Sequence, residues 1–229
     1  MTKLSDRLET IIGMVKPCRV AADIGCDHGF TAIRLVESGI ADCAVASDVR
    51  SGPLKRAKEH VREAGLTGKI DLREGDGLMT LMPDEAEAVI IAGMGGRLMT
   101  RLLEEGADRL GAAKQLILSP HADVPAVRRC VSALGFRIEE ERIVEELGNF
   151  YTVMRAVPGE ETLTPLQENY GPRLLETRPA EFLEMLRRKK ELCLERLEQI
   201  GVPKSERAAL ARQENEALLS ELEALLQEE

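Results

Sequence analysis

Short apolar runs alternate with amphipathic stretches over residues 1–157. The runs have the length of buried strands, whereas between them apolar residues recur three and four positions apart, which is the spacing of one helix face. The pattern predicts strands at 19–24, 41–47, 69–73, 88–92 and 115–118, and helices at 4–15, 31–38, 53–64, 97–103 and 124–134. Strand–helix alternation is typical of a largely parallel α/β sheet with helices on both faces.

Two further strands are predicted where this alternation ends. They span 136–144 and 150–157, and Gly148 and Asn149 lie between them, so we expect a closing antiparallel hairpin.

The pattern changes after Pro158 and Gly159. β-Branched residues almost disappear, and Glu, Leu, Arg, Lys and Ala dominate, which is a helical composition. Apolar residues form one stripe over 182–200 and a second over 210–225, with a helix-breaking Gly201-Val202-Pro203 between them. We predict an α/β domain over 1–158 and a helical, coiled-coil hairpin over 159–229, with Ser205 capping the second helix.

Composition narrows the class of protein. The 229 residues contain no apolar run of membrane-spanning length and no basic-then-apolar start, so we expect a cytoplasmic protein without a membrane partner. The five cysteines form no CxxC pair, and the three histidines lack the spacing of metal ligands. We therefore expect neither disulfides nor a metal site.

The net charge of −9 argues at first against nucleic acid as a partner. It is unevenly distributed, because residues 1–156 carry 21 basic and 24 acidic side chains, whereas the remainder carries 10 and 16. The first region is thus nearly neutral and has basic groups of its own. The second region contains one concentrated basic run, Arg187 to Lys190.

The most informative stretch is Asp23-Ile-Gly25-Cys26-Asp27-His28-Gly29-Phe30, where a predicted strand runs into a glycine-containing turn and then a helix. Ligands of open α/β sheets bind at such strand ends. A dinucleotide site would need a third glycine, and Asp27 would repel a pyrophosphate. A Walker loop is absent. The pattern resembles instead the first motif of class I S-adenosylmethionine-dependent methyltransferases, whose cofactor carries cationic groups that carboxylates attract.

Later strand ends support this interpretation. Asp48 follows the second strand at the position of a ribose-hydroxyl acceptor. Asp76 follows the third strand, where an acid can accept from the adenine amino group. The fourth strand ends in an open loop, Gly93-Met94-Gly95-Gly96. As cofactor contacts these patterns predict Asp23, Gly25, Cys26, Gly29, Asp48, Val49, Asp76, Gly77 and Gly93.

The sequence as a whole resembles the bacterial tRNA (adenine-22-N1)-methyltransferases. The resemblance rests on five stretches: 4–8, 23–30, 46–57, 75–78 and the Ile91-Ala92-Gly-Met-Gly-Gly run. It implies a Rossmann-like class I fold, S-adenosylmethionine as cofactor, tRNA as partner and methylation of adenine N1. Two features depart from the family: Phe30 stands in place of a tyrosine, and Ser119-Pro120-His121 in place of Gln-Pro-Asn.

We assign the adenine end of the site to Asp27, His28, Phe30, Gly93, Met94, Gly95 and Gly96. Asp27 would stabilise the cationic adenine and Phe30 would stack on it, while His28 either orients the base or is a structural turn residue. For His121 a structural role is favoured. The basic residues expected to contact tRNA are Arg7, Arg97, Arg101, Arg187, Arg188, Lys189 and Lys190.

Two other classes of function remain open. A methyltransferase for a small molecule or a protein would use the same cofactor residues, and its helical tail would then serve dimerisation. A cofactor-binding protein without catalysis is disfavoured, because the open glycine loop and the acids are all present. The expected oligomeric state is a monomer or a weak homodimer.

Overall fold

The structure is a computed structural model that describes residues 4–227. The chain divides into two compact units, the first ending at Glu176 and the second beginning at Thr177. No helix within the described residues is both long enough and apolar enough to cross a membrane.

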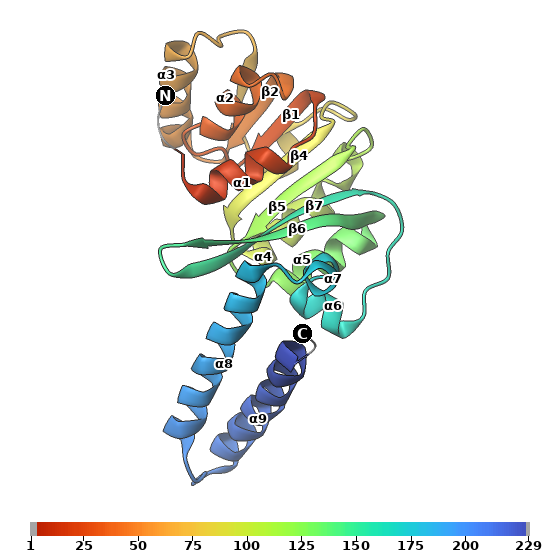
Figure 1. Ribbon diagram of the computed structural model, residues 1–229. Helices are drawn as coiled ribbons and strands as arrows, with labels where there is room; N and C mark the ends of the chain where they lie inside the picture. Colours follow the sequence, from red (N-terminus) through yellow and green to blue (C-terminus); the bar gives the residue numbers. More distant parts are fainter. Residues whose placement is uncertain (1–3, 228–229) are drawn as a thin grey trace. The chain divides into compact units, whose positions relative to one another are not determined.

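A seven-stranded sheet forms the centre of the first unit (Figure 1). Its strand order is β3-β2-β1-β4-β5-β7-β6, and the first five strands of the chain run parallel. Strand β7 joins β5 antiparallel and pairs with β6 as a hairpin. The strands are β1 (Cys18–Ile24), β2 (Ala41–Asp48), β3 (Ile70–Glu74), β4 (Ala88–Met94), β5 (Gln115–Pro120), β6 (Phe136–Glu146) and β7 (Asn149–Pro158).

Helices cover both faces of this sheet. The apolar side chains of α1 (Asp6–Met14), α2 (Phe30–Glu37) and α3 (Ser51–Glu63) form one core with one face. Those of α4 (Gly96–Glu105) and α5 (Val124–Ala133) form a second core with the other face. The short 3₁₀ helices η1 (Gly77–Thr80) and η2 (Ala107–Arg109) complete this part of the chain. The predicted α/β sheet is confirmed.

The predicted closing hairpin is also confirmed, and both of its strands are longer than expected. Its turn places Leu147 and Gly148 at φ values of 52° and 76°. Two consecutive positive φ values match the right-handed twist of an antiparallel pair, which keeps the register tight up to the turn.

The first unit continues beyond the predicted boundary at residue 158. Two short helices that the sequence pattern did not reveal, α6 (Pro165–Tyr170) and α7 (Pro172–Thr177), follow β7. Buried Arg128 on α5 fixes this segment, because its guanidinium binds the Glu141 carboxylate at 2.8 Å and donates to the Glu168 carbonyl at 2.8 Å. Because the buried Arg128–Glu141 pair also hydrogen bonds to α6, it holds the segment after β7 against the sheet.

The second unit contains α8 (Ala180–Ile200) and α9 (Glu206–Gln227). They run antiparallel: the Cys193 thiol donates to the Asn215 carbonyl at 3.1 Å, and Lys190 pairs with Glu223 at 2.9 Å. The Ser205 hydroxyl accepts from the Ala208 N–H at 3.2 Å, as a cap should. Two antiparallel helices are therefore present, whereas coiled-coil packing between them stays a prediction.

Candidate active site

A cavity of about 680 Å³ lies at the carboxyl ends of β1, β2 and β4. This edge is where open α/β sheets bind ligands, because the strand order reverses between β1 and β4. The lining comes from the start of α1, the turn after β1, the ends of β2 and β4, and the residue after β5. Its members include Arg7, Asp23, Gly25, Asp27, Phe30, Asp48, Val49, Gly93, Leu98 and His121.

The turn after β1 is held against the neighbouring strand. The N–H groups of Gly25 and Cys26 both donate to the Ser47 carbonyl on β2, at 2.8 and 2.9 Å. Gly25 has a φ of 76°, and a Cβ placed there would lie 2.8 Å from the Met94 side chain. Only glycine fits this position without strain, so the turn lies close to the end of β4. The predicted open loop over residues 93–96 is wrong, because Gly93 and Met94 belong to the sheet as the end of β4 and Gly96 begins α4.

Asp23 is buried at the end of β1, with a residue exposure of 5%. Its Oδ2 atom has no hydrogen-bond partner among the described residues. Burial raises the pKa of Asp23 to about 7; the negative charge of Asp48 adds to this rise, and a hydrogen bond from the Ala32 backbone opposes it. A buried carboxylate that lines a cavity and has one oxygen without a hydrogen-bond partner fits a ligand with a cationic group.

Asp48 is equally buried, and its carboxylate is held in place from two sides. Oδ1 accepts from the Arg50 N–H at 2.9 Å, and Oδ2 accepts from the Asp27 N–H at 3.3 Å. Oδ1 also accepts from the Arg50 Nε at 3.4 Å, so Oδ2 is the oxygen with a lone pair left for a ligand hydroxyl. Next to Asp48, the side chains of Val49 and Leu98 line the cavity. These residues are 63% and 41% exposed, so their apolar surface is free to contact a flat ring such as adenine.

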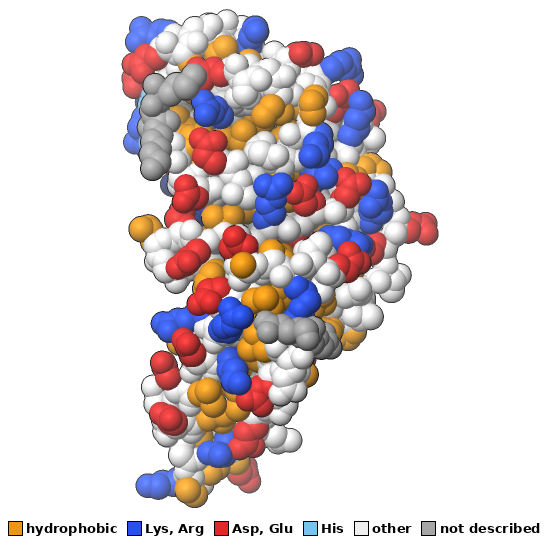
Figure 2. All heavy atoms as spheres, viewed as in Figure 1, with side chains coloured by type: hydrophobic (Ala, Val, Ile, Leu, Met, Phe, Trp, Pro, Cys, Tyr) orange, Lys and Arg blue, Asp and Glu red, His pale blue; other side chains and the backbone are white. Residues whose placement is uncertain are grey.

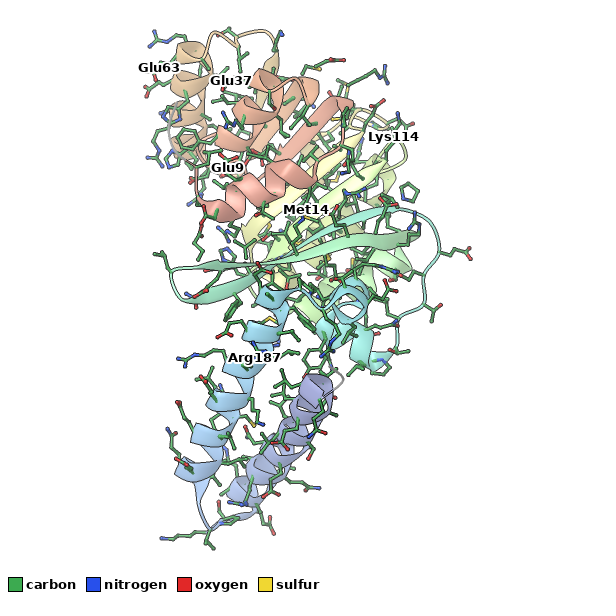
Figure 3. The ribbon with its side chains drawn as sticks, in the orientation of Figure 1. Glu9, Met14, Glu37, Glu63, Lys114 and Arg187 are labelled. Carbon is green, nitrogen blue, oxygen red and sulfur yellow. The ribbon has the colours of Figure 1, made fainter. Side chains whose placement is uncertain are left out.

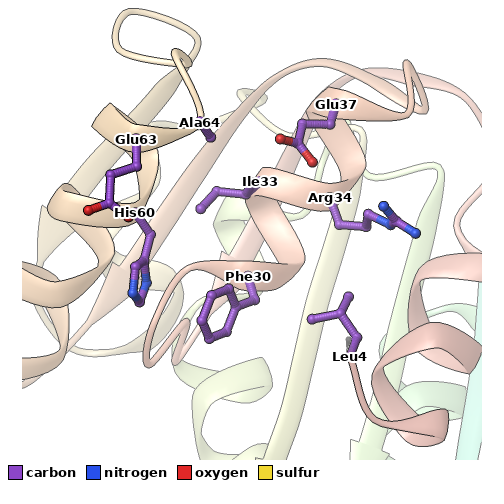
Figure 4. Close-up of a pocket in the computed structure, with 8 residues that line it drawn as sticks. All are labelled: Leu4, Phe30, Ile33, Arg34, Glu37, His60, Glu63 and Ala64. Atoms are coloured by element: carbon purple, nitrogen blue, oxygen red, sulfur yellow. The ribbon is translucent and has the colours of Figure 1, made fainter. Parts of the chain in front are cut away.

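Phe30 separates this cavity from a second one of about 300 Å³ between α2 and α3 (Figure 4). His60 stacks on Phe30, with the ring centroids 4.7 Å apart and the planes at 21°. His60 also hydrogen bonds to the His28 carbonyl at 3.0 Å, and Arg56 donates to the His28 ring at 3.2 Å. One face of Phe30 is therefore already covered by an imidazole, and α3 reaches the active-site turn through His28.

The opposite side of the main cavity is built by α1 and the residue after β5. Arg7 donates to His121 Nε2 at 2.5 Å, and its guanidinium lies 4.6 Å from the centroid of the Tyr151 ring. Glu146 on β6 faces the same guanidinium at 3.7 Å.

The structure brings together most of the predicted cofactor and adenine residues. Ten of them line the cavity with Arg7: Asp23, Gly25, Cys26, Asp27, His28, Phe30, Asp48, Val49, Gly93 and Met94. Burial, chiefly, and the nearby Asp23 carboxylate raise the pKa of the Cys26 thiol. This thiol therefore stays protonated and contributes no nucleophile.

Five predicted positions lie outside the cavity lining: Gly29, Asp76, Gly77, Gly95 and Gly96. Asp76 pairs with Arg101 on α4 at 3.0 Å. Gly77 and Gly96 serve packing, because a Cβ at Gly77 would meet Leu102 and a Cβ at Gly96 would meet the Ala122 carbonyl, each at 2.4 Å. A contact between Asp76 and a bound adenine stays a prediction.

The predicted tRNA-binding residues are spread over both units. Arg97 is exposed and lies 3.6 Å from Asp123. On α8 Arg187 pairs with Glu184 and Arg188 with Glu191, and Figure 3 labels Arg187 on this helix. Lys189 also has a partner. In the view of Figure 2, Lys and Arg alternate with Asp and Glu along this hairpin.

Sequence reasoning did not single out several cavity residues, among them Thr31, Arg50 and Leu98. Leu98 could have been identified from the sequence, because it is a large apolar residue on the polar side of the helix predicted over 97–103. Such a residue is a candidate for contact with a ligand. Within residues 4–227, no group of three His, Cys, Asp or Glu side chains is arranged to hold a metal ion.

The fold and the site together define an α/β protein with a carboxylate-lined site for a nucleoside-type ligand. Residues 4–154 match a family model described as a methyltransferase domain. The chain belongs to this methyltransferase family.

Two relatives, one of them with two solved structures, refine the comparison. The tRNA (adenine(22)-N(1))-methyltransferase of Bacillus subtilis strain 168 is 37% identical over 158 residues, which cover 69% of this chain and 66% of that enzyme. The crystal structure of Streptococcus pneumoniae Sp1610, a putative tRNA (m1A22) methyltransferase, is 31% identical with a TM-score of 0.91, covering 98% of this chain and all of that one. Its complex with S-adenosyl-L-methionine gives 30% identity and a TM-score of 0.87, over 98% and 100% of the two chains. These findings confirm the resemblance seen in the sequence.

The raised pKa of Asp23 predicts a pH-dependent stability penalty. Below pH 3.8 the carboxyl is protonated in the folded and the unfolded chain alike, so it has no effect. As the pH rises toward about 7, only the unfolded chain loses the proton, and the folded state loses stability. At 1.36 kcal/mol per pH unit, the penalty is about 4 kcal/mol at most. Asp23→Asn, which cannot ionise, should therefore be more stable than the parent at pH 8 and nearly equal to it at pH 4.

Urea unfolding of the ligand-free protein at both pH values measures this difference. Asp42→Asn changes an exposed acid on the neighbouring strand and serves as the control. A gain in stability from Asp23→Asn that is equal at pH 4 and pH 8 would contradict the assignment.

Proposed function

We propose that the protein transfers a methyl group from S-adenosylmethionine to N1 of an adenine in tRNA, at position 22 of the D-loop. The observation that carries the proposal is the buried carboxylate of Asp23, whose Oδ2 atom has no hydrogen-bond partner among the described residues and which lines a cavity beside Gly93 and Met94 at the end of β4. The relatives named above support the choice of tRNA and of adenine N1.

The residues present fit the cofactor. When bound, S-adenosylmethionine supplies a methyl group carried on a positively charged sulfonium. Asp48 would accept from the ribose hydroxyls, since both of its oxygens are fixed by backbone N–H groups. Asp23 would pair with the amino group, and Val49 and Leu98 would enclose the adenine ring.

The acceptor needs little chemical assistance from the chain. Adenine N1 has an in-plane lone pair, so methylation requires in-line placement and stabilisation of the positive charge that forms on the ring, and no obligatory base. Asp27 lines the cavity with its side chain 56% exposed, where it would face that charge. Gly93 leaves room for the base, and Phe30 would stack on it with the face that His60 leaves free. Because N1 is the pairing edge, the base must leave the folded tRNA.

Helix α3 provides a basic surface beside the active-site turn. It exposes Lys55, Arg56, Lys58 and Arg62, and Arg56 contacts His28 of the active-site turn. None of Lys55, Lys58 and Arg62 has a carboxylate partner within residues 4–227, so these charges are available to phosphates. This explains how a chain of net charge −9 would approach tRNA.

The tail is proposed to contact a second part of the tRNA through Arg187 to Lys190. These side chains are paired on the surface of α8, and exposed pairs of this kind contribute only about 0–1 kcal/mol. Phosphates would therefore replace the carboxylates at small cost. With tRNA as substrate, we expect the enzyme in the cytoplasm.

The reaction is tested by nucleoside mass spectrometry of unmodified tRNA incubated with the protein and S-adenosylmethionine. The expected product is 1-methyladenosine. Asp48→Ala should weaken cofactor binding about 10–100-fold by calorimetry, because charge-assisted hydrogen bonds are lost. Asp42→Ala, on the same strand and exposed, is the matched control. Methylation of another atom, or unchanged cofactor affinity in Asp48→Ala, would overturn the respective assignment.

Two double variants separate the basic surfaces. Lys55→Ala with Lys58→Ala on α3, and Arg187→Ala with Arg188→Ala on α8, should each weaken tRNA binding and reduce its salt dependence by about one to two counterions. If only the α3 variant does so, the tail does not grip tRNA and the dimerisation alternative is favoured. If tRNA affinity shows no salt slope even in the parent, a neutral small-molecule substrate is favoured instead.

A further inference from the structure

The side of the cavity opposite the acids contains a linked set of three side chains from distant parts of the chain. Arg7 comes from α1, His121 follows β5 and Tyr151 lies on β7. The Arg7 guanidinium donates to His121 Nε2 at 2.5 Å and stacks over Tyr151 at 4.6 Å, and the His121 and Tyr151 rings are 5.4 Å apart. Arg7 and His121 line the cavity.

This geometry fixes the protonation state of His121. Arginine has only N–H donors, so the contact requires Nε2 to accept, which leaves the ring neutral with its proton on Nδ1. The backbone holds the ring in place as well, because the His121 N–H donates to the Met94 carbonyl at 2.9 Å. A Cβ placed on Gly93 would lie 3.9 Å from Nε2, so the imidazole borders the end of β4 itself.

The charged groups that face His121 favour the neutral ring. Arg7 from α1 is cationic, Glu146 from β6 is anionic, and β7 contributes the phenol of Tyr151; β4 contributes backbone. Burial and the positive charge of Arg7 lower the pKa of His121, and Glu146 opposes them. His121 is therefore neutral at physiological pH.

The Arg7 guanidinium reaches the cavity although one edge of it is occupied. Its buried Nε faces the Glu146 carboxylate at 3.7 Å, too far for a hydrogen bond, and the side chain as a whole lines the cavity. The guanidinium thus borders a cavity whose other side bears Asp23, Asp27 and Asp48. A target nucleotide brings two kinds of charge into this space: a phosphate that is anionic throughout, and a base that becomes cationic on methylation.

We propose that His121 is a positioning residue whose neutral ring holds Arg7 against the cavity, where the guanidinium binds the phosphate of the target nucleotide. The acids on the other side then receive the cationic sulfonium and the cationic adenine. Protonation of His121 abolishes the acceptor at Nε2 and repels Arg7, so nucleotide binding weakens in acid. This inference rests on the proposed function.

Steady-state methylation of tRNA between pH 5 and 8.5, at saturating cofactor, tests the proposal. The variant His121→Asn retains an acceptor oxygen that does not titrate, whereas His121→Ala removes the acceptor. We expect His121→Asn to keep kcat/KM within about threefold of the parent value at pH 8. On the acid side of its pH profile, kcat/KM should fall less steeply than in the parent, by the equivalent of one proton. His121→Ala should raise KM for tRNA at least tenfold at every pH and leave cofactor affinity unchanged. Asp42→Asn, which changes an exposed acid outside the cavity lining, is the control and should leave the pH profile unchanged.

A measurement without substrate separates this inference from the proposed function. Nitrogen chemical shifts of the His121 ring should show the Nδ1–H tautomer, and the pKa of the ring should rise in Arg7→Ala. Either an Nε2–H tautomer, or an acid limb in His121→Asn that superimposes on that of the parent, overturns the proposal. A parent protein that methylates no tRNA but shows the expected tautomer contradicts the proposed function alone.

Discussion

The site depends on a carboxylate that the fold buries without giving it a full set of partners. Asp23 ends β1 in the middle of the parallel sheet, between β2 and β4, where water is excluded and backbone hydrogen bonds are committed to the strands. The Ala32 N–H compensates in part, yet one oxygen stays unpaired. The ligand-free protein therefore keeps a destabilised acid at its centre, which a cationic ligand relieves. Stability is given up here for binding, as is common at functional sites.

The turn geometry follows from the same requirement. A ligand reaches Asp23 only if the chain after β1 turns away sharply and no side chain at the end of β4 fills the space beside the carboxylate. Gly25 provides the first, because its positive φ and the contact with Met94 exclude a side chain. Gly93 has a φ of 76° and lines the cavity without a side chain, and Gly96 allows α4 to begin against the Ala122 carbonyl. The glycines of the two motifs thus have different tasks, some in the cavity and some in the packing behind it.

The largely parallel sheet, the helices on both of its faces and the gathering of most predicted site residues around one cavity were predictable from sequence, because apolar periodicity and strand-end chemistry are local signals. Asp76 shows what the sequence could not predict. Its position after β3 follows from the pattern of apolar residues, but its pairing with Arg101 on α4 does not, because the two residues lie far apart in sequence. The same holds for Arg7, His121 and Tyr151, which meet only through the topology. Helices α6 and α7 were not predicted, because the contacts that hold this segment to the sheet join residues far apart in sequence, such as Arg128 with the Glu168 carbonyl and Arg173 with the Ile138 carbonyl.

The central claim is that Asp23 is partly protonated in the ligand-free protein near neutral pH and ionises when it meets the cationic cofactor. Isothermal titration calorimetry of S-adenosylmethionine binding at pH 6.5, in buffers of different ionisation enthalpy, measures this directly. Release of on the order of half a proton or more per cofactor is expected, and it should disappear in Asp23→Asn. Binding enthalpies that do not depend on the buffer, with full affinity retained in Asp23→Asn, would contradict the claim.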